Sequence, residues 1–264
     1  MLPTSQNKIV CITGMHRSGT SLVTSWLERC GLSIHNGSVM GAAICNPKGH
    51  FEDMDFFNIH QSELMALNPR TVGWKICMDR DLRFSATSLE KAKRLINDRN
   101  AKYRYWGWKD PRSIFFFQQW KSLIPDLKGL FIWRPCAEVV HSLIKRSGAV
   151  NKRNIARINA LQSLKLWLSS NKRVCALKEQ YPSDILLFSV DWILSHDNDA
   201  LALINERFKT DLTHFPIQKI YEEDLMHNKV PWFIKGISIC SEALLLEKKL
   251  LALSDGHCQG KSRD

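Results

Sequence analysis

The chain has 264 residues, of which 37 are Lys or Arg, 26 are Asp or Glu, and 44% are hydrophobic. This hydrophobic fraction is ordinary for a folded protein and excludes disorder over most of the length. The formal charge of +11 arises in residues 90–180, which hold 20 basic and 6 acidic side chains. Such an excess indicates either an anionic partner or a solvated lysine-rich surface.

Short apolar runs alternate with segments of helical periodicity along the chain. The predicted strands are residues 8–13, 105–109, 129–133 and 185–190. The predicted helices are residues 21–30, 53–67, 89–98, 113–124, 137–146, 154–179, 199–208 and 241–253. Gly31, Pro125 and Gly148 mark the ends of three of them. This alternation predicts an α/β fold of the P-loop NTPase type, with three α/β/α layers and a central parallel sheet.

The length fits one large domain or two small ones, and we expect a single domain over residues 1–264 with flexible ends at 1–7 and 256–264. No apolar run reaches the roughly 18 residues that a membrane helix needs. No signal peptide is visible before residue 8, so we expect a cytoplasmic protein with no integral membrane segment. The eight cysteines form no CxxC pair, which predicts scattered buried thiols.

The segment GMHRSGTS, residues 14–21, lies between the first predicted strand and the first predicted helix. Gly14 and Gly19 allow backbone N–H groups to turn toward a phosphate, and the helix start adds partial positive charge. ATP- and GTP-binding loops have Lys after the second Gly, where this chain has Thr20. The segment therefore predicts a nucleotide phosphate site that disfavours ATP or GTP hydrolysis, and a purely structural glycine turn is the alternative.

This loop resembles that of the P-loop sulfotransferases, in which Lys or Arg precedes Ser-Gly-Thr and then Thr or Ser. The resemblance implies that it binds the 5′-phosphosulfate of 3′-phosphoadenosine 5′-phosphosulfate (PAPS). His16 lies inside the loop, and we expect it to be a ligand contact or a packing residue. The matching residues are Arg17, Ser18, Gly19, Thr20 and Ser21.

A second signature of that family is an Arg at a strand end with a Ser eight residues later, and both bind the 3′-phosphate of the nucleotide. Arg134 ends the predicted strand GLFIW, and Ser142 stands at the required spacing. An Arg can bind a phosphate with two charge-assisted hydrogen bonds. Pro135 follows the Arg directly, whereas the family places Pro one residue later. The resemblance covers roughly residues 8–210.

Sulfuryl transfer needs a base for the acceptor proton and cations for the sulfonate. The segment NPKGHFE, residues 46–52, resembles one of the bacterial carbohydrate-type sulfotransferases, which implies Glu52 as the base and His50 as the alternative. Glu52 could instead be a charge at a helix N-terminus. His16 and Asp110 are the other candidates for the base.

Residues 108–112, WKDPR, resemble a further segment of the family, in which a Lys stabilises the sulfonate. The resemblance implies that role for Lys109 and, as a second cation, for Arg112. A surface salt bridge of either residue with Asp110 is the alternative.

Together these resemblances imply a PAPS-dependent sulfotransferase that releases 3′,5′-ADP and requires no metal. Its expected partners are a small-molecule nucleotide donor and a glycan or glycolipid acceptor. The alternatives are an inactive nucleotide-binding P-loop protein and an atypical P-loop kinase. A nucleic-acid binder lacks any recognised motif.

Overall fold

The computed structural model describes residues 7–35, 51–69, 75–78, 80–149, 158–221, 230–238 and 241–256. Within these residues, four strands form one parallel sheet in the order β2-β1-β3-β4. They are β1 (Lys8–Gly14), β2 (Tyr105–Lys109), β3 (Lys128–Trp133) and β4 (Ile185–Ser189). All four confirm the predicted strands, whose continuous apolar runs are typical of a sheet covered on both faces.

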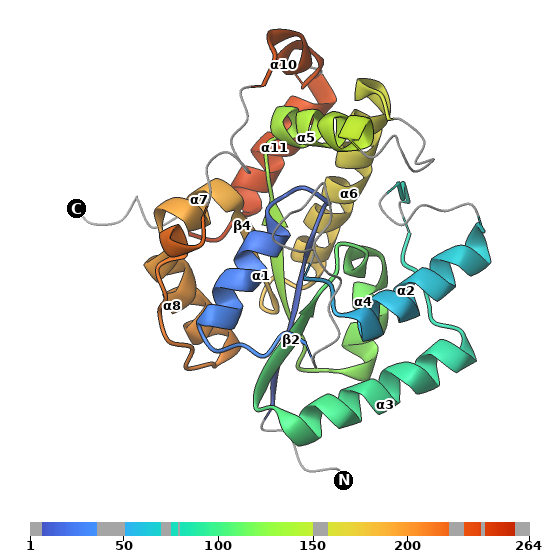
Figure 1. The fold of residues 1–264 in the computed structure, drawn as a ribbon, viewed down its shortest axis with the longest axis vertical. Helices are drawn as coiled ribbons and strands as arrows, with labels where there is room; N and C mark the ends of the chain where they lie inside the picture. Colours follow the sequence, from blue (N-terminus) through green and yellow to red (C-terminus); the bar gives the residue numbers. More distant parts are fainter. Residues whose placement is uncertain are drawn as a thin grey trace.

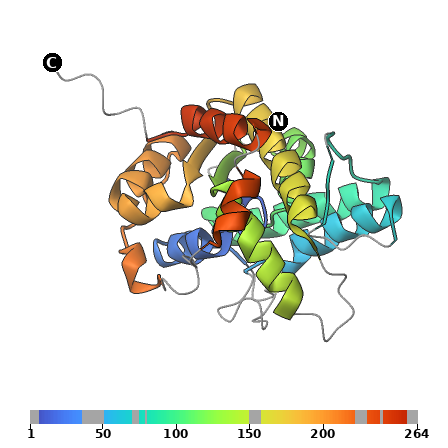
Figure 2. The same cartoon turned by 90° about the horizontal axis from the view of Figure 1, so that it is seen from above.

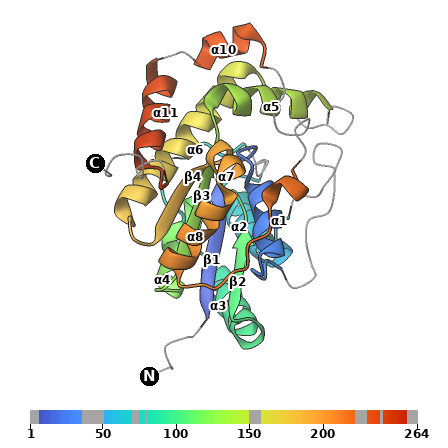
Figure 3. The same cartoon turned by 90° about the vertical axis from the view of Figure 1, so that its left-hand side faces the viewer.

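Helices cover both faces of the sheet (Figures 1 and 2). One face carries α1 (Thr20–Arg29), α7 (Val190–Ser195) and α8 (Asp197–Phe208). The other carries α2 (Met54–Leu67), α3 (Ala86–Lys102), α4 (Ser113–Leu123) and α6 (Ala160–Gln180). Figure 3 shows two further helices beyond the end of the sheet that lies farthest from the N-terminus, α5 (Cys136–Ala149) and α10 (Trp232–Ser238). This is the expected three-layer α/β/α architecture of the P-loop NTPase type.

An aromatic cluster packs α2 and α4 against the edge strand β2. Phe56 stacks on Trp108 with ring centroids 4.3 Å apart, and it contacts Trp120 of α4 at 5.0 Å. Trp106 completes the cluster at 6.2 Å from Phe56. Because large aromatic side chains bury much apolar surface, this cluster fixes the start of α2 beside the C-terminal end of β2.

The last helix, α11 (Ser241–Leu253), packs against α6, and polar contacts connect it and the two residues after it to α5, β3 and α6. Its Glu247 Oε1 accepts a hydrogen bond of 2.6 Å from the backbone N–H of Cys136, at the start of α5. Trp133 donates to Ser254 at 2.8 Å, and Lys178 of α6 pairs with Asp255 at 2.7 Å.

The structure differs from the sequence predictions in several places. Helix α5 continues past Gly148, because a glycine inside a helix costs only about 1 kcal/mol. Helix α6 begins at Ala160, where Asn159 and Gln162 form a capping box, and not at residue 154. Helices α7 and α10 were not predicted, and α7 begins at Val190, which was predicted to end a strand. Cys77 is exposed, although the other described cysteines are buried.

None of the described helices combines the length and the hydropathy of a membrane span. The predicted flexible ends lie outside the described residues except for Asn7 and Gly256.

Candidate active site

Three of the predicted loops leave the sheet side by side. Strand β1 lies between β2 and β3, and register pairs Ile12 with Lys109 and Gly14 with Ile132. Since the strands are parallel, their C-terminal ends share one edge, which is where α/β folds bind ligands. This edge faces α5 and α10 in Figure 3.

The loop after β1 has the backbone that a phosphate site requires. A Cβ atom at Gly14 would lie 2.1 Å from the carbonyl oxygen of Ile132, so only glycine fits there. Arg17 has a φ of 72° and Gly19 a φ of 88°, both left-handed. Helix α1 then starts with no side-chain cap and no acidic residue in its first turn, and the Ser18 Oγ atom is buried with no partner among the described residues. These donors fit an anionic oxygen group.

Arg17 joins this loop to α5. Its Nε donates a hydrogen bond of 2.9 Å to Ser142 Oγ, so residues from both predicted phosphate segments are in direct contact. Arg134, at the other end of the second segment, is buried, and its Nε donates to Glu138 at 2.7 Å. Trp167 of α6 donates to the Arg134 carbonyl oxygen at 3.1 Å and fixes the backbone at this turn.

Glu52 and Lys109 form a buried ion pair. Lys109 Nζ lies 2.7 Å from Glu52 Oε1, and the two residues are only 1% and 4% exposed. Burial raises the pKa of the Glu52 carboxyl above its usual value, although Lys109 opposes this shift. Burial likewise lowers the pKa of Lys109, against the effect of Glu52. The predicted alternative was a surface salt bridge of either cation with Asp110. Lys109 instead pairs with Glu52, whereas Arg112 does pair with Asp110, in a buried position.

Two features position Glu52. Phe51 has a φ of 55°, which is a strained conformation for a bulky residue. Asp53 caps α2 by accepting from the backbone N–H of Asp55 at 3.0 Å, and Arg99 of α3 pairs with Asp53 at 2.7 Å. Burial raises the pKa of Asp53 to about 6, against the opposing effect of Arg99. His50, the alternative base, lies outside the described residues.

Asp110 is the centre of a buried hydrogen-bond network. His60 Nδ1 lies 2.8 Å from Asp110 Oδ2, and Trp120 donates to His60 Nε2 at 2.7 Å. Because Nε2 accepts, we assign the proton to Nδ1, which donates to Asp110. Arg112 Nη1 lies 3.1 Å from Asp110 Oδ1. Burial alone would raise the pKa of Asp110, but Arg112 and His60 hold it well below its usual value. So weak a base does not suit proton abstraction.

His16 is also a weak base. Burial first, and then the nearby positive charges of Arg112 and Arg146, hold the pKa of His16 well below 6.5. Its Nε2 atom is buried with no hydrogen-bond partner among the described residues. Of the four candidates for the base, Glu52 is the described residue whose pKa shift suits the role.

The sequence analysis did not identify three residues that affect the candidate site: His60, Arg99 and Arg146. His60 contacts Asp110, and Arg99 contacts Asp53. The partners in each pair are about fifty positions apart, so no local motif contains them both. Arg146 could have been found from its spacing, because it follows Ser142 by four residues on a predicted helix.

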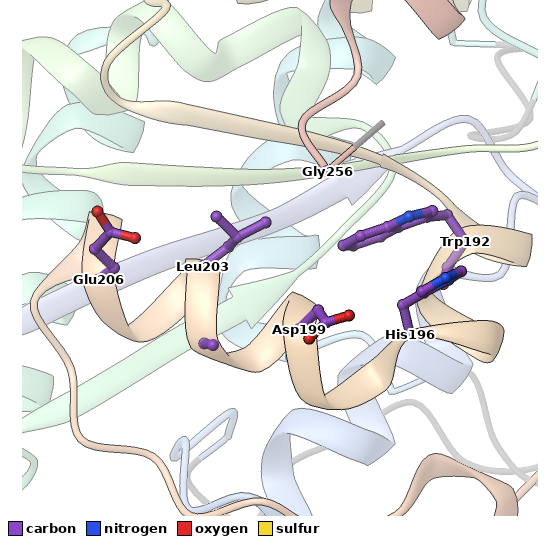
Figure 4. Close-up of a pocket in the computed structure, with 7 residues that line it drawn as sticks. Trp192, His196, Asp199, Leu203, Glu206 and Gly256 are labelled. Atoms are coloured by element: carbon purple, nitrogen blue, oxygen red, sulfur yellow. The ribbon is translucent and has the colours of Figure 1, made fainter. Parts of the chain in front are cut away.

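A separate cavity of about 320 Å³ lies between α7, α8 and Gly256. Figure 4 shows Trp192 and His196 at one end and Asp199, Leu203 and Glu206 along α8. The rings of Trp192 and His196 are stacked, with centroids 5.2 Å apart. None of the predicted site residues lines this cavity.

No protein-family model and no curated protein matches the sequence. Solved structures do match the fold. The sulfotransferase domain from the curacin biosynthetic pathway is 14% identical, with a TM-score of 0.55 over 92% of this chain and 97% of that one. The sulfotransferase domain of the Synechococcus olefin synthase is 16% identical, with a TM-score of 0.52 over 94% and 96%. A Mycobacterium tuberculosis sulfotransferase is 11% identical, with a TM-score of 0.53 over 93% of this chain and 77% of that one. At these identities the likeness is one of fold.

Proposed function

We propose that this chain is a sulfotransferase that moves the sulfuryl group of PAPS to a hydroxyl or amine of an acceptor, with a glycan or glycolipid as that acceptor. The observation that carries the proposal is the hydrogen bond of 2.9 Å from Arg17 Nε to Ser142 Oγ. It joins two residues 125 positions apart, from the two segments that the resemblance to one family predicts to hold the two phosphate ends of a nucleotide.

The nucleotide would be bound at both of its ends. Backbone N–H groups of residues 14–21, with Arg17, Ser18 and Thr20, hold the 5′-phosphosulfate. Arg134 and Ser142 hold the 3′-phosphate, and such charge-assisted contacts favour it over a plain ribose hydroxyl. A 3′-phosphorylated nucleotide is therefore preferred to ATP.

The chemical step is an in-line displacement at sulfur. The acceptor oxygen forms a bond to sulfur, the bond from sulfur to the phosphate oxygen breaks, and 3′,5′-ADP leaves. Glu52 takes the acceptor proton, and its raised pKa makes it a stronger base than an exposed glutamate. Lys109, 2.7 Å from Glu52, supplies positive charge beside the transferred group. Because Arg17 and Lys109 supply this charge, we propose that no metal ion is needed.

Nucleotide binding is tested by thermal unfolding. A ligand at a hundred times its Kd stabilises the fold by about 2.7 kcal/mol. We expect a clear rise in Tm with 3′,5′-ADP and a much smaller one with ATP and Mg²⁺. Arg134→Ala should abolish most of the rise, whereas Arg94→Ala, an exposed residue of α3, should leave it unchanged. An unchanged Tm with 3′,5′-ADP would refute the proposal.

Transfer is tested with labelled PAPS and a panel of sugars, glycolipids and phenols. A labelled product would establish that the protein transfers the sulfuryl group to that acceptor. A rise in Tm with 3′,5′-ADP but no transfer to any acceptor would indicate a nucleotide-binding protein without this activity.

A further inference from the structure

Two buried nitrogen atoms, one inside the loop of residues 14–21 and one just after β2, have no hydrogen-bond partner in the described part of the chain. Arg112 is only 7% exposed, and neither its Nε nor His16 Nε2 has a hydrogen-bond partner among the described residues. Both residues line a cavity of about 10 Å³, whose other walls include Ile76, Ile114 and Phe115. A volume of this size holds one oxygen atom or one water molecule.

Arg112 is held in a fixed orientation. Its Nη1 lies 3.1 Å from Asp110 Oδ1, and its guanidinium carbon lies 4.2 Å from the centre of the Phe57 ring. Asp110 is in turn held by His60. A guanidinium that is already oriented loses little entropy when it binds a carboxylate or a sulfate group.

The surroundings of His16 are positively charged. Arg112 and Arg146 both lower its pKa, after the larger effect of burial, and the nearby Asp110 does not reverse this. Arg146 lies one helical turn after Ser142, on the side of α5 that contacts Arg17. Arg112 is paired with Asp110, so Arg146 adds positive charge near the His16 imidazole beyond that pair, which favours an anion.

Arg17 and His16 are neighbours in the loop but contact different parts of the structure. Arg17 contacts Ser142, one of the residues proposed to bind the nucleotide, whereas His16 lines a mostly apolar cavity with residues of α4. We propose that the acceptor carries an acidic group and that Arg112 Nε binds one oxygen of that group in the cavity beside His16, with the charge of Arg146 favouring the anion from α5. This inference rests on the proposed function, because it names the class of acceptor.

The test compares matched acceptors that differ in one acidic group: methyl glucuronide with methyl glucoside, and 4-hydroxybenzoate with 4-hydroxybenzyl alcohol. With labelled PAPS, we expect kcat/KM for an acidic member to exceed that of its neutral partner by about tenfold or more. Arg146→Gln should remove most of this preference while keeping the rise in Tm with 3′,5′-ADP. Lys145→Gln removes the same charge from the exposed neighbouring position and should change neither.

Arg112→Lys provides a second variant, because it keeps the charge beside Asp110 but lacks the Nε donor. We expect it to fold, to bind 3′,5′-ADP and to lose the preference for acidic acceptors. Equal or greater transfer to the neutral members would overturn the inference, as would the absence of transfer to any acidic member. If 3′,5′-ADP also fails to raise the Tm, the proposed function itself has failed.

Discussion

Glu52 and Lys109 illustrate how a pair of ordinary side chains acquires unusual acid–base properties. Removing both charges from water is costly, and their mutual attraction offsets that cost only while both are present. Burial has the larger effect on both groups, so the carboxylate becomes a stronger base and the ammonium group becomes a stronger acid. The sequence named both residues from motifs, but their distance of 2.7 Å depends on a contact across 57 positions, which no local pattern encodes.

The role of Glu52 as base is tested by Glu52→Gln. This variant keeps the size of the side chain and one oxygen that can accept from Lys109, so 3′,5′-ADP should still raise the Tm. We expect kcat to fall by about two to four orders of magnitude, the usual effect of losing a general base. Retained turnover would move the base elsewhere, with His50 as the next candidate.

The pH dependence of wild-type kcat/KM provides an independent check on Glu52. A base acts when deprotonated, so the rate should fall as the pH falls through the pKa of Glu52. Because burial raises that pKa, the midpoint of the acidic limb should lie above 4.5, the ordinary value for a glutamate. Glu52→Gln should lack this limb in its residual activity.

Asp110 should contribute more to stability than any exposed carboxylate. Asp110→Asn removes the charge that partners Arg112 in a buried site, and we expect a loss of about 3–5 kcal/mol in the free energy of unfolding by urea at pH 7. Asp126→Asn, at an exposed position, should change stability by less than about 0.5 kcal/mol.

The sign of the pH effect on Asp110 follows from its lowered pKa. Ionised Asp110 stabilises the fold fully at pH values above 3.8, the ordinary pKa of an aspartate. This stabilisation is lost as the pH falls further, because the unfolded chain binds the proton more readily. The difference between wild type and Asp110→Asn should therefore shrink in acid. A difference that is the same at pH 7 and pH 3 would contradict this account.

At the scale of elements, the strands and most helices were predictable because their signals are local. An apolar run bounded by glycine, or an apolar side chain every three to four residues, is written in consecutive positions. The ends of α5 and α6 were less predictable. Gly148 is a helix-ending signal, but a glycine inside a helix costs only about 1 kcal/mol. The capping box at Asn159 involves a polar pair that resembles ordinary loop sequence.

The turn from β1 into the phosphate loop offers a test of backbone geometry. Gly14→Ala places a Cβ 2.1 Å from the Ile132 carbonyl at a φ of 148°, so strands β1 and β3 must separate locally. We expect a loss of about 1–3 kcal/mol in stability and a weaker response to 3′,5′-ADP. Gly236→Ala is the matched control, because its Cβ would meet nothing within 4 Å inside α10, and it should be neutral or slightly stabilising. Equal melting temperatures for the two variants would count against this description of the turn.

For the molecule as a whole, the fold explains much of the uneven charge. Basic side chains of residues 90–180 pair with acidic side chains from the two flanking parts of the chain. These pairs include Arg99 with Asp53, Lys109 with Glu52, Arg173 with Asp81, Lys128 with Asp184, Lys172 with Glu242 and Lys178 with Asp255. Composition suggested either an anionic partner or a solvated surface, whereas these cations connect separate parts of the sequence.

Such pairing supports our proposal that the chain is a single domain. We expect urea unfolding followed by far-UV circular dichroism to coincide with unfolding followed by tryptophan fluorescence, because the buried Trp26 and Trp108 lie on opposite faces of the sheet. Two separated transitions would show that one face can unfold without the other.

The position of α11 has a consequence for synthesis on the ribosome. Asp255 accepts hydrogen bonds from Lys178 and from the backbone of Leu187 in β4, and Glu247 caps the helix that carries Ser142. The residues that we propose to bind the nucleotide are synthesised about a hundred positions or more before these contacts. During synthesis, at roughly 5–20 residues per second, the loops after β1 and β3 would therefore be exposed for several seconds before α11 can pack against α6.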